Sequence, residues 1–325
     1  MDVKELILYV TSRCNLDCSF CYIDRKHKYE SPLMLSKEQL VWVKKNINAK
    51  KVFLMGGEPL LYPHLKTALQ LFKNVTISTN SLLVEENISL IRRFDVSLQL
   101  SIEGGREETN RTRGKDVWEK VLDVAKLCKE NGVNVFFRSG LWHGNLKRLD
   151  ELFEVGRRLD VPVVLFPRID KRPLEFSEQV YIFDKALEYD AVVAVPNFFQ
   201  YIGKHQGRCG AGSERVSVFY DGRITPCQMD FDFVFGRVGD DVGVIEKMRD
   251  VFVNNFRKVP LECIGCPYSK VCKGGCYVCK YYFGCPLRRR VDVGHFVSLH
   301  EDVSRENVEV KTDRLVDFMR EVIVC

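Results

Sequence analysis

The chain has 325 residues, 46% of them hydrophobic and 29% charged, a composition that permits a sizeable core and excludes a disordered, collagen-like or coiled-coil protein. Its 49 Lys and Arg residues exceed its 44 Asp and Glu residues by too little to indicate nucleic acid or a membrane surface as a partner. The first residues include Asp2, Lys4 and Glu5 without a secretion signal, and no apolar run is long enough to span a membrane, so we expect a cytoplasmic protein.

Short β-branched runs alternate with longer amphipathic stretches over the first 190 residues. The predicted strands are 6–11, 51–55, 75–79, 96–101, 133–139 and 161–166, and the predicted helices are 36–47, 64–72, 85–92, 117–131, 146–159 and 177–189. Ser36 and Gln39 suit a capping box, and Asn131-Gly132 suits a left-handed helix end. Six such units predict an α/β fold with a partial (β/α)6 TIM-type barrel, whose active groups lie at the carboxyl ends of the strands.

Thirteen cysteines are an unusual number for such a chain. Without an export signal they indicate metal ligands rather than a disulfide framework. Cys14, Cys18 and Cys21 directly follow the first predicted strand, and a second group runs from residue 209 to residue 285. Only Cys128 and Cys325 stand apart.

Three thiolates on one short loop can hold three corners of a cubane iron-sulfur cluster and leave one iron open to a small molecule. The alternatives are a structural zinc site completed by His27, or plain structural cysteines. Two further features bear on this choice. Phe20 directly precedes Cys21, and Gly56-Gly57-Glu58-Pro59 directly follows the second predicted strand.

Together these motifs resemble the radical S-adenosylmethionine (SAM) superfamily, over about residues 1–190. The resemblance implies that Cys14, Cys18 and Cys21 are catalytic and carry a [4Fe-4S] cluster whose open iron binds SAM. It also implies that one electron, from a donor such as ferredoxin or flavodoxin, cleaves SAM to methionine and a 5′-deoxyadenosyl radical, which abstracts hydrogen from a substrate.

The same resemblance assigns residues to the SAM site. It places Phe20 beside the cofactor and gives the SAM amino group to the segment Gly56, Gly57, Glu58 and Pro59. It gives the ribose to Thr79 and Asn80, and the ribose and carboxylate ends to Ser101 and Arg113. Arg111 is a rival to Arg113, and Asn80 is alternatively only a turn residue.

The second group resembles the SPASM domain, which holds two auxiliary [4Fe-4S] clusters. Its cysteines are Cys209, Cys227, Cys263, Cys266, Cys272, Cys276, Cys279 and Cys285. The resemblance assigns the first cluster to Cys209, Cys227 and Cys276, with or without an open iron. It assigns the second to Cys263, Cys266, Cys272 and a later cysteine, for which we favour Cys285 over Cys279. A pair of zinc sites is the alternative.

We therefore expect a barrel over residues 1–200, a small cysteine-rich SPASM domain over 201–290, and a tail with a closing helix over 291–325. Between about residues 208 and 286 we expect metal to replace an apolar core. The run Tyr220-Asp221-Gly222-Arg223 predicts one hairpin there.

The substrate is the least determined part. Gln228 stands where sulfatase maturases of this family have a catalytic aspartate, which argues against formylglycine formation and leaves Asp230 as the nearest acid. His143, after the fifth predicted strand, is a candidate substrate contact. We expect a peptide or protein side chain as substrate. The alternatives are a small precursor such as a modified porphyrin, whose carboxylates would meet Arg288, Arg289 and Arg290, and a non-catalytic zinc-binding interaction module.

Overall fold

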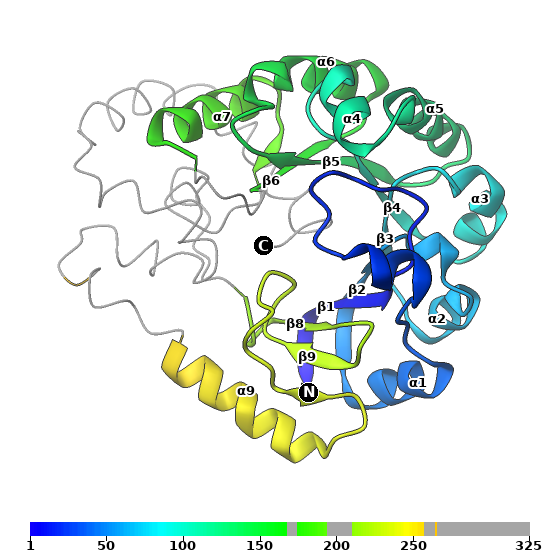
Figure 1. Cartoon of the computed structure of the whole chain (residues 1–325), viewed down its shortest axis with the longest axis vertical. Coiled ribbons are helices and arrows are strands. Elements are labelled where there is room, and N and C mark those ends of the chain that lie inside the picture. The colour runs from blue at the N-terminus through cyan, green and yellow to red at the C-terminus, as the bar shows by residue number, and fades with distance from the viewer. Residues whose placement is uncertain (168–173, 194–209, 257–263, 265–325) are drawn as a thin grey trace.

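The chain folds around one curved ten-stranded sheet, which the computed structural model describes over residues 1–167, 174–193, 210–256 and 264 (Figure 1). The strand order is β10-β9-β8-β1-β2-β3-β4-β5-β6-β7. Neighbours from β8 through β1 to β7 are parallel, and β9 is antiparallel to both of its neighbours, β8 and β10. The strands are β1 Asp2–Thr11, β2 Asn48–Gly56, β3 Val75–Thr79, β4 Ser97–Ser101, β5 Val135–Leu141, β6 Val163–Pro167, β7 Val192–Val193, β8 Arg215–Val218, β9 Arg223–Thr225 and β10 Gly236–Arg237.

Helices connect the parallel strands and cover the outer side of the curved sheet (Figure 1). They are α1 Lys37–Asn46, α2 Leu65–Leu71, α3 Val84–Arg93, α4 Arg106–Arg113, α5 Val117–Glu130, α6 Leu149–Leu159 and α7 Phe176–Glu188. A further helix, α9 Val242–Phe256, follows β10. Three short turns of helix, η1 Lys26–Glu30, η2 Pro59–Leu61 and η3 Leu146–Arg148, lie in the loops. This arrangement is the parallel α/β architecture that the sequence predicts.

All six predicted strands and all six predicted helices of the first 190 residues are present, with ends that differ by a few residues. The capping box of α1 is formed, because Ser36 accepts from the backbone of Gln39 and the Gln39 side chain accepts from the backbone of Ser36. Gly132 follows α5 with a φ of +67°, so the left-handed end predicted there is also confirmed. The sequence did not predict α4, β7, β10, α9 or the π-helical turn η1.

Strand β1 is buried on both faces and places side chains in two different clusters. Leu6, Leu8 and Val10 belong to the main core under the helices, whereas Ile7 and Tyr9 pack with Phe53 and Phe219 in a smaller cluster. Successive side chains of a strand point to opposite faces, so the smaller cluster lies on the inner side of the curved sheet. Tyr9 thereby reaches the interior of the barrel.

The segment after residue 210 continues the barrel sheet. β8 pairs in parallel with β1, and the buried carboxylate of Glu5 accepts hydrogen bonds from Nε and Nη2 of Arg215 at 2.8 and 2.5 Å. The hairpin predicted at residues 220–223 is confirmed, since β9 returns antiparallel to β8. The alternation of strands and helices thus ends with the barrel, and a hairpin is added at the β1 edge of its sheet.

The expectation of little apolar core after residue 208 was wrong for residues 210–256. Seven of their apolar side chains are buried in the main core: Ala211, Val216, Val218, Ile224, Phe235, Ile245 and Phe252. They are buried because the added hairpin shares the core of the barrel sheet. Residues 201–209, 257–263 and 265–290 of the predicted SPASM domain, and the whole predicted tail, lie outside the described residues.

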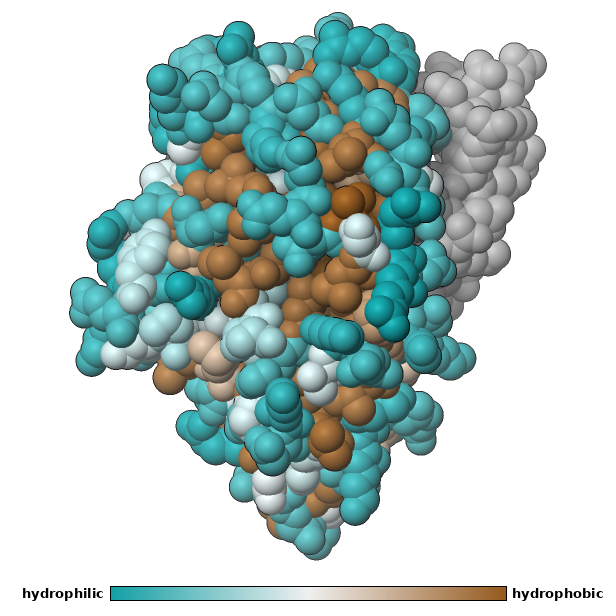
Figure 2. Space-filling view, turned by 90° about the vertical axis from the view of Figure 1, so that its right-hand side faces the viewer, coloured by the Kyte–Doolittle hydropathy of each residue, from teal (hydrophilic) through white to brown (hydrophobic). Residues whose placement is uncertain are grey.

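One face of the described part is mixed in hydrophobic character. Figure 2 looks at the right-hand side of Figure 1 and shows hydrophobic and hydrophilic residues interspersed over that face. Within residues 1–167, 174–193 and 210–256, no helix combines the length and the apolar character that crossing a membrane requires.

Candidate active site

A cavity of about 380 Å³ lies at the carboxyl ends of the barrel strands. This volume falls within the range of about 300–1,000 Å³ that is typical of small-molecule sites. Ten of the twelve residues predicted for the cluster and for SAM line it: Cys14, Cys18, Phe20, Cys21, Gly56, Gly57, Thr79, Asn80, Ser101 and Arg113. Glu58 and Pro59 are buried beside it and do not line it.

The three thiols of the loop after β1 are half-buried and line the cavity together. The Cys14 sulfur accepts from the backbone of Leu16 at 3.5 Å and from Nδ2 of Asn80 at 3.9 Å. Burial raises the pKa of Cys14 to about 11, and it also raises the pKa of Cys18, which the nearby Arg113 opposes. Metal binding at these thiols therefore has to displace protons.

The donor set fits a cluster better than a single metal ion. Among the described residues, no three His, Cys, Asp or Glu side chains are grouped around one point as a mononuclear ion requires. A cubane cluster gives each thiolate its own iron, so its ligands need not converge. His27, the predicted alternative ligand, is held by Asp24 with 2.6 Å between Nδ1 and Oδ2, and it does not line the cavity.

The two glycines after β2 let that strand end pack directly against the start of the cysteine loop. Gly56 has a φ of +155°, and a Cβ there would lie 2.2 Å from the Thr11 oxygen. A Cβ on Gly57 would lie 2.2 Å from the Arg13 oxygen. The backbone nitrogens of Gly57 and Glu58 donate to the oxygens of Thr11 and Arg13, each at 2.7 Å. Only glycine permits this approach.

The carboxylate of Glu58 is wholly buried and occupied by the protein itself. It accepts from the Thr79 hydroxyl at 2.8 Å and from the backbone nitrogens of Asn80 and Leu60 at 2.8 and 3.1 Å. Burial raises its pKa to about 7, against the effect of these donors. The side chain therefore holds the end of β3 against the end of β2. This differs from the contact with an ammonium group that we expected, and leaves the backbone of Gly56 and Gly57 to face the cavity.

Arg113 reaches the cavity from α4. Its Nη2 donates to Oε1 of Glu103 at 2.5 Å, and its guanidinium lies 5.3 Å from the centre of the Phe20 ring. Its rival Arg111 is 57% exposed, pairs with Glu108 and does not line the cavity. Of the two arginines considered from the sequence, Arg113 is the one placed to meet a ligand there.

Several lining residues were missed by the sequence interpretation. Glu103 follows β4 and lies only two residues after Ser101, so its position at a strand end was an available signal. Arg138 of β5 lines the cavity with its guanidinium 4.1 Å from the centre of the Phe166 ring. Tyr9 also lines the cavity, and its ring stacks on that of Phe219 with 4.5 Å between the ring centres. No local motif predicts that Arg138 or Tyr9 lies at the site.

The segment after β9 closes the cavity on another side, through Gln228, Met229 and Phe231. Cys227 is buried next to it, and its sulfur accepts from the backbone of Met229 at 3.4 Å. Asp230 accepts from the backbone of Asp232 and Phe233 and does not line the cavity. The hairpin thus brings Cys227, the one cysteine of the second group that lies among the described residues, close to this wall.

The remaining predicted site residues do not meet at the cavity. His143 is bound by Glu178, with 2.5 Å between Nδ1 and Oε1, and does not line it. Cys128 is buried in the core on α5. The other predicted cluster ligands, Cys209, Cys263, Cys266, Cys272, Cys276, Cys279 and Cys285, lie outside the described residues, as do Arg288, Arg289 and Arg290.

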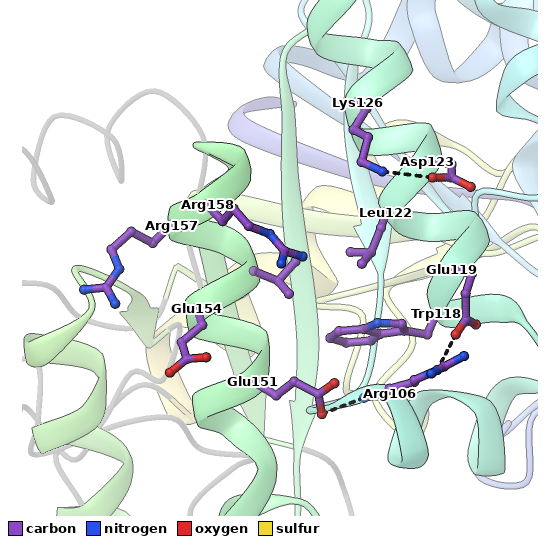
Figure 3. A pocket seen from close by; sticks show the side chains of 11 residues that line it. Arg106, Trp118, Glu119, Leu122, Asp123, Lys126, Glu151, Glu154, Arg157 and Arg158 are labelled. Carbon is purple, nitrogen blue, oxygen red and sulfur yellow. Dashed lines mark hydrogen bonds and ion pairs between the residues drawn. The ribbon is translucent and has the colours of Figure 1, made fainter.

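A second hollow, of about 780 Å³, lies on the outer side of the barrel between α5 and α6 (Figure 3). Trp118, Leu122 and Val155 are its apolar part, and four cationic and four acidic side chains surround them. Arg106 pairs with Glu119, and Lys126 pairs with Asp123 at 3.1 Å. Its charges compensate one another, so it favours no ligand of either sign.

Residues 8–155 match the family model described as the Radical SAM superfamily. The sporulation killing factor maturation protein SkfB of Bacillus subtilis (strain 168) is 26% identical over 260 residues, which are 72% of this chain and 62% of that protein. This chain thus spans less than two thirds of the length of SkfB.

Two other relatives have names that state different activities. The Fe-coproporphyrin III synthase of Methanosarcina barkeri is 25% identical over 175 residues, 51% of this chain and 44% of that protein. The probable GTP 3′,8-cyclase of Archaeoglobus fulgidus is 27% identical over 286 residues, 76% of this chain and 94% of that protein.

Two solved structures share the fold. Native anSMEcpe with bound AdoMet has a TM-score of 0.70 and 19% identity, covering 86% of this chain and 91% of that chain. SuiB of Streptococcus suis, bound to its precursor peptide SuiA, has a TM-score of 0.65 and 17% identity, covering 87% and 74%. At these identities the likeness shows the fold alone.

Proposed function

We propose that this protein is a radical SAM enzyme whose [4Fe-4S] cluster is held by Cys14, Cys18 and Cys21, and that it modifies a peptide or protein side chain. One observation carries the proposal. The three cysteines and the residues expected to bind SAM, which come from four strand ends and from α4, line a single cavity. A radical SAM enzyme needs such a shared cavity, because SAM must reach the open iron of the cluster and the substrate must lie next to the 5′-carbon of SAM.

Each part of the cavity has a role in this proposal. The three thiolates bind three irons. The backbone at Gly56 and Gly57 approaches the amino group of SAM, and Arg113, held by Glu103, binds its carboxylate. Thr79 and Glu58 fix the end of β3, from which Asn80 faces the ribose. When bound, the cluster supplies the electron that cleaves SAM reductively to methionine and a 5′-deoxyadenosyl radical.

The proposal extends to the second group of cysteines. We assign them two auxiliary [4Fe-4S] clusters in a SPASM domain, with Cys227 as one ligand. Support comes from the cysteine pattern and from the position of Cys227, which is buried beside the wall of the cavity. Clusters placed there would exchange electrons with a bound substrate.

A peptide substrate is favoured by the names of two similar proteins. SkfB is a maturation protein for a killing factor, and SuiB was solved with a precursor peptide. The likeness to an Fe-coproporphyrin III synthase favours a second candidate, a carboxylate-rich tetrapyrrole. Purified enzyme that changes porphyrin absorbance on titration, and leaves precursor peptides unmodified, would favour this second candidate.

Anaerobic reconstitution with iron and sulfide tests the proposal. The wild type should bind about twelve irons, and the triple variant Cys14→Ala/Cys18→Ala/Cys21→Ala about eight, given four irons per cubane cluster. With SAM and dithionite, only the wild type should form 5′-deoxyadenosine. Cys128→Ala is the matched control and should keep both the iron content and the formation of 5′-deoxyadenosine, because Cys128 is buried on α5 and does not line the cavity. A colourless zinc-binding protein would contradict the proposal.

A further inference from the structure

The wall of the cavity that follows β9 contains an amide side chain with an unsatisfied oxygen. Gln228 is 7% exposed and lines the same cavity as Cys14, Cys18 and Cys21. Within the described residues, its Oε1 is buried and has no hydrogen-bond partner. Buried polar side chains are normally hydrogen-bonded, so this oxygen needs a donor from elsewhere.

The surroundings of Gln228 give it no competing role. Met229 and Phe231, which share its wall, are uncharged, and the nearby Asp230 is turned to the backbone of Asp232 and Phe233. An unsatisfied acceptor in such a setting lowers the stability of the fold. Its presence at a cavity wall is therefore better explained by a ligand than by folding.

The position of Gln228 separates it from the residues assigned to SAM. It follows β9, which lies beyond β8 on one side of β1, whereas Gly56, Ser101 and Arg113 come from elements on the other side of β1. Figure 1 shows the hairpin of β8 and β9 apart from β3 and β4. Gln228 therefore enters the shared cavity from an element that carries none of the residues assigned to SAM, which leaves it available to a substrate.

We infer that Gln228 is a substrate-binding residue whose side-chain carbonyl accepts a hydrogen bond from a neutral N–H group, such as that of a peptide amide. This inference rests on the proposed function, and it adds the chemistry of the recognised group. An acceptor oxygen on an uncharged wall suits an amide, and it repels a carboxylate brought to the same point.

The test compares two sets of probes in the reconstituted enzyme with SAM and dithionite. One set is a mixture of N-acetylated amino acid N-methylamides, and the other is the matching O-methyl esters, in which oxygen replaces one N–H. The readout is the concentration of each set that half-maximally stimulates 5′-deoxyadenosine formation. Wild type should need about ten times more ester than amide, the worth of one good hydrogen bond. Gln228→Glu, which keeps an acceptor, should retain this preference. Gln228→Leu should be half-maximally stimulated by the same concentration of either set.

An equal response of the wild type to both sets, or no response to either, would overturn the inference. So would a preference that persists in Gln228→Leu. A wild type that forms no 5′-deoxyadenosine at all would instead refute the proposed function.

Thermal unfolding supplies a readout that needs no substrate. Replacing an unsatisfied buried amide by Leu should leave the melting temperature of the reconstituted protein equal or higher. A fall of several degrees in Gln228→Leu would show that the amide has a structural partner, and would also overturn the inference.

Discussion

Arg113 and Glu103 form a buried ion pair on the wall of the cavity, with 2.5 Å between Nη2 and Oε1 and side-chain exposures of 11% and 4%. The other carboxylate oxygen of Glu103 accepts from the backbone of Gly140 at 2.9 Å. One carboxylate therefore ties α4, which carries Arg113, to strand β5. The direction of the guanidinium is fixed by this contact rather than by α4 alone.

Glu103→Gln should raise the KM for SAM roughly tenfold with a smaller effect on kcat, because a charge-assisted hydrogen bond is replaced by a weaker neutral one. Arg113→Gln should raise it at least as much. Steady-state formation of 5′-deoxyadenosine at varied SAM concentration measures both effects.

The matched control for Arg113 is Arg111, two residues earlier on α4. Its side chain is largely exposed and pairs with Glu108, so Arg111→Gln should leave the KM for SAM within about twofold of wild type. If Arg111→Gln raises the KM and Arg113→Gln does not, the assignment of the SAM carboxylate has to move to Arg111.

Local sequence signals account for most of the first 190 residues. The strands and helices of the first 190 residues followed from hydrophobic periodicity, and the cysteine loop and Gly56-Gly57 were placed at strand ends by adjacency alone. The polar helix α4, REETNRTR, has no apolar repeat to reveal it, so the element that carries Arg113 was missed.

Long-range pairing was the other source of error. β8 pairs with β1, and Glu5 and Arg215, which bind each other across this pair, are 210 positions apart in the sequence. No local pattern predicts such a pairing. The same addition brings Phe219 onto Tyr9 and Gln228 into the cavity. The cavity wall on the hairpin side therefore could not be assembled from the sequence, although the cluster side could.

Gly57→Ala should lower kcat/KM for SAM by roughly tenfold or more, because an added Cβ 2.2 Å from the Arg13 oxygen forces backbone to move and displaces the cysteine loop. Gly132→Ala provides the control. Gly132 also has a positive φ, but nothing lies within 4 Å of a Cβ there, so only stability should fall, by about 1 kcal/mol. Equal activity losses in both variants would argue against the close packing at Gly57.

Glu58 should make stability fall as pH rises. Its pKa is raised to about 7 in the folded protein from 4.5, so between these values the folded chain keeps a proton that the unfolded chain releases. The contribution is fully present below pH 4.5 and is lost as pH approaches 7, a change of about 3 kcal/mol. Urea unfolding of the cluster-free protein between pH 5 and 7.5 should show the advantage of wild type over Glu58→Gln shrinking with pH. A constant difference would contradict the raised pKa.

The buried pair of Glu5 and Arg215 should hold the hairpin to the barrel. Arg215→Met leaves the Glu5 carboxylate buried without its cation, at 5% side-chain exposure, and should lower the free energy of unfolding by about 3–5 kcal/mol. Adding Glu5→Leu should recover much of this loss, since no uncompensated charge then remains. The neighbouring pair of Lys4 and Glu214 joins the same two segments at 2.9 Å but is exposed, so Lys4→Met should cost less than about 1 kcal/mol. Because both pairs bridge the same segments, an Arg215→Met effect as small as that of Lys4→Met would mean that β8 adds little to the stability of the barrel.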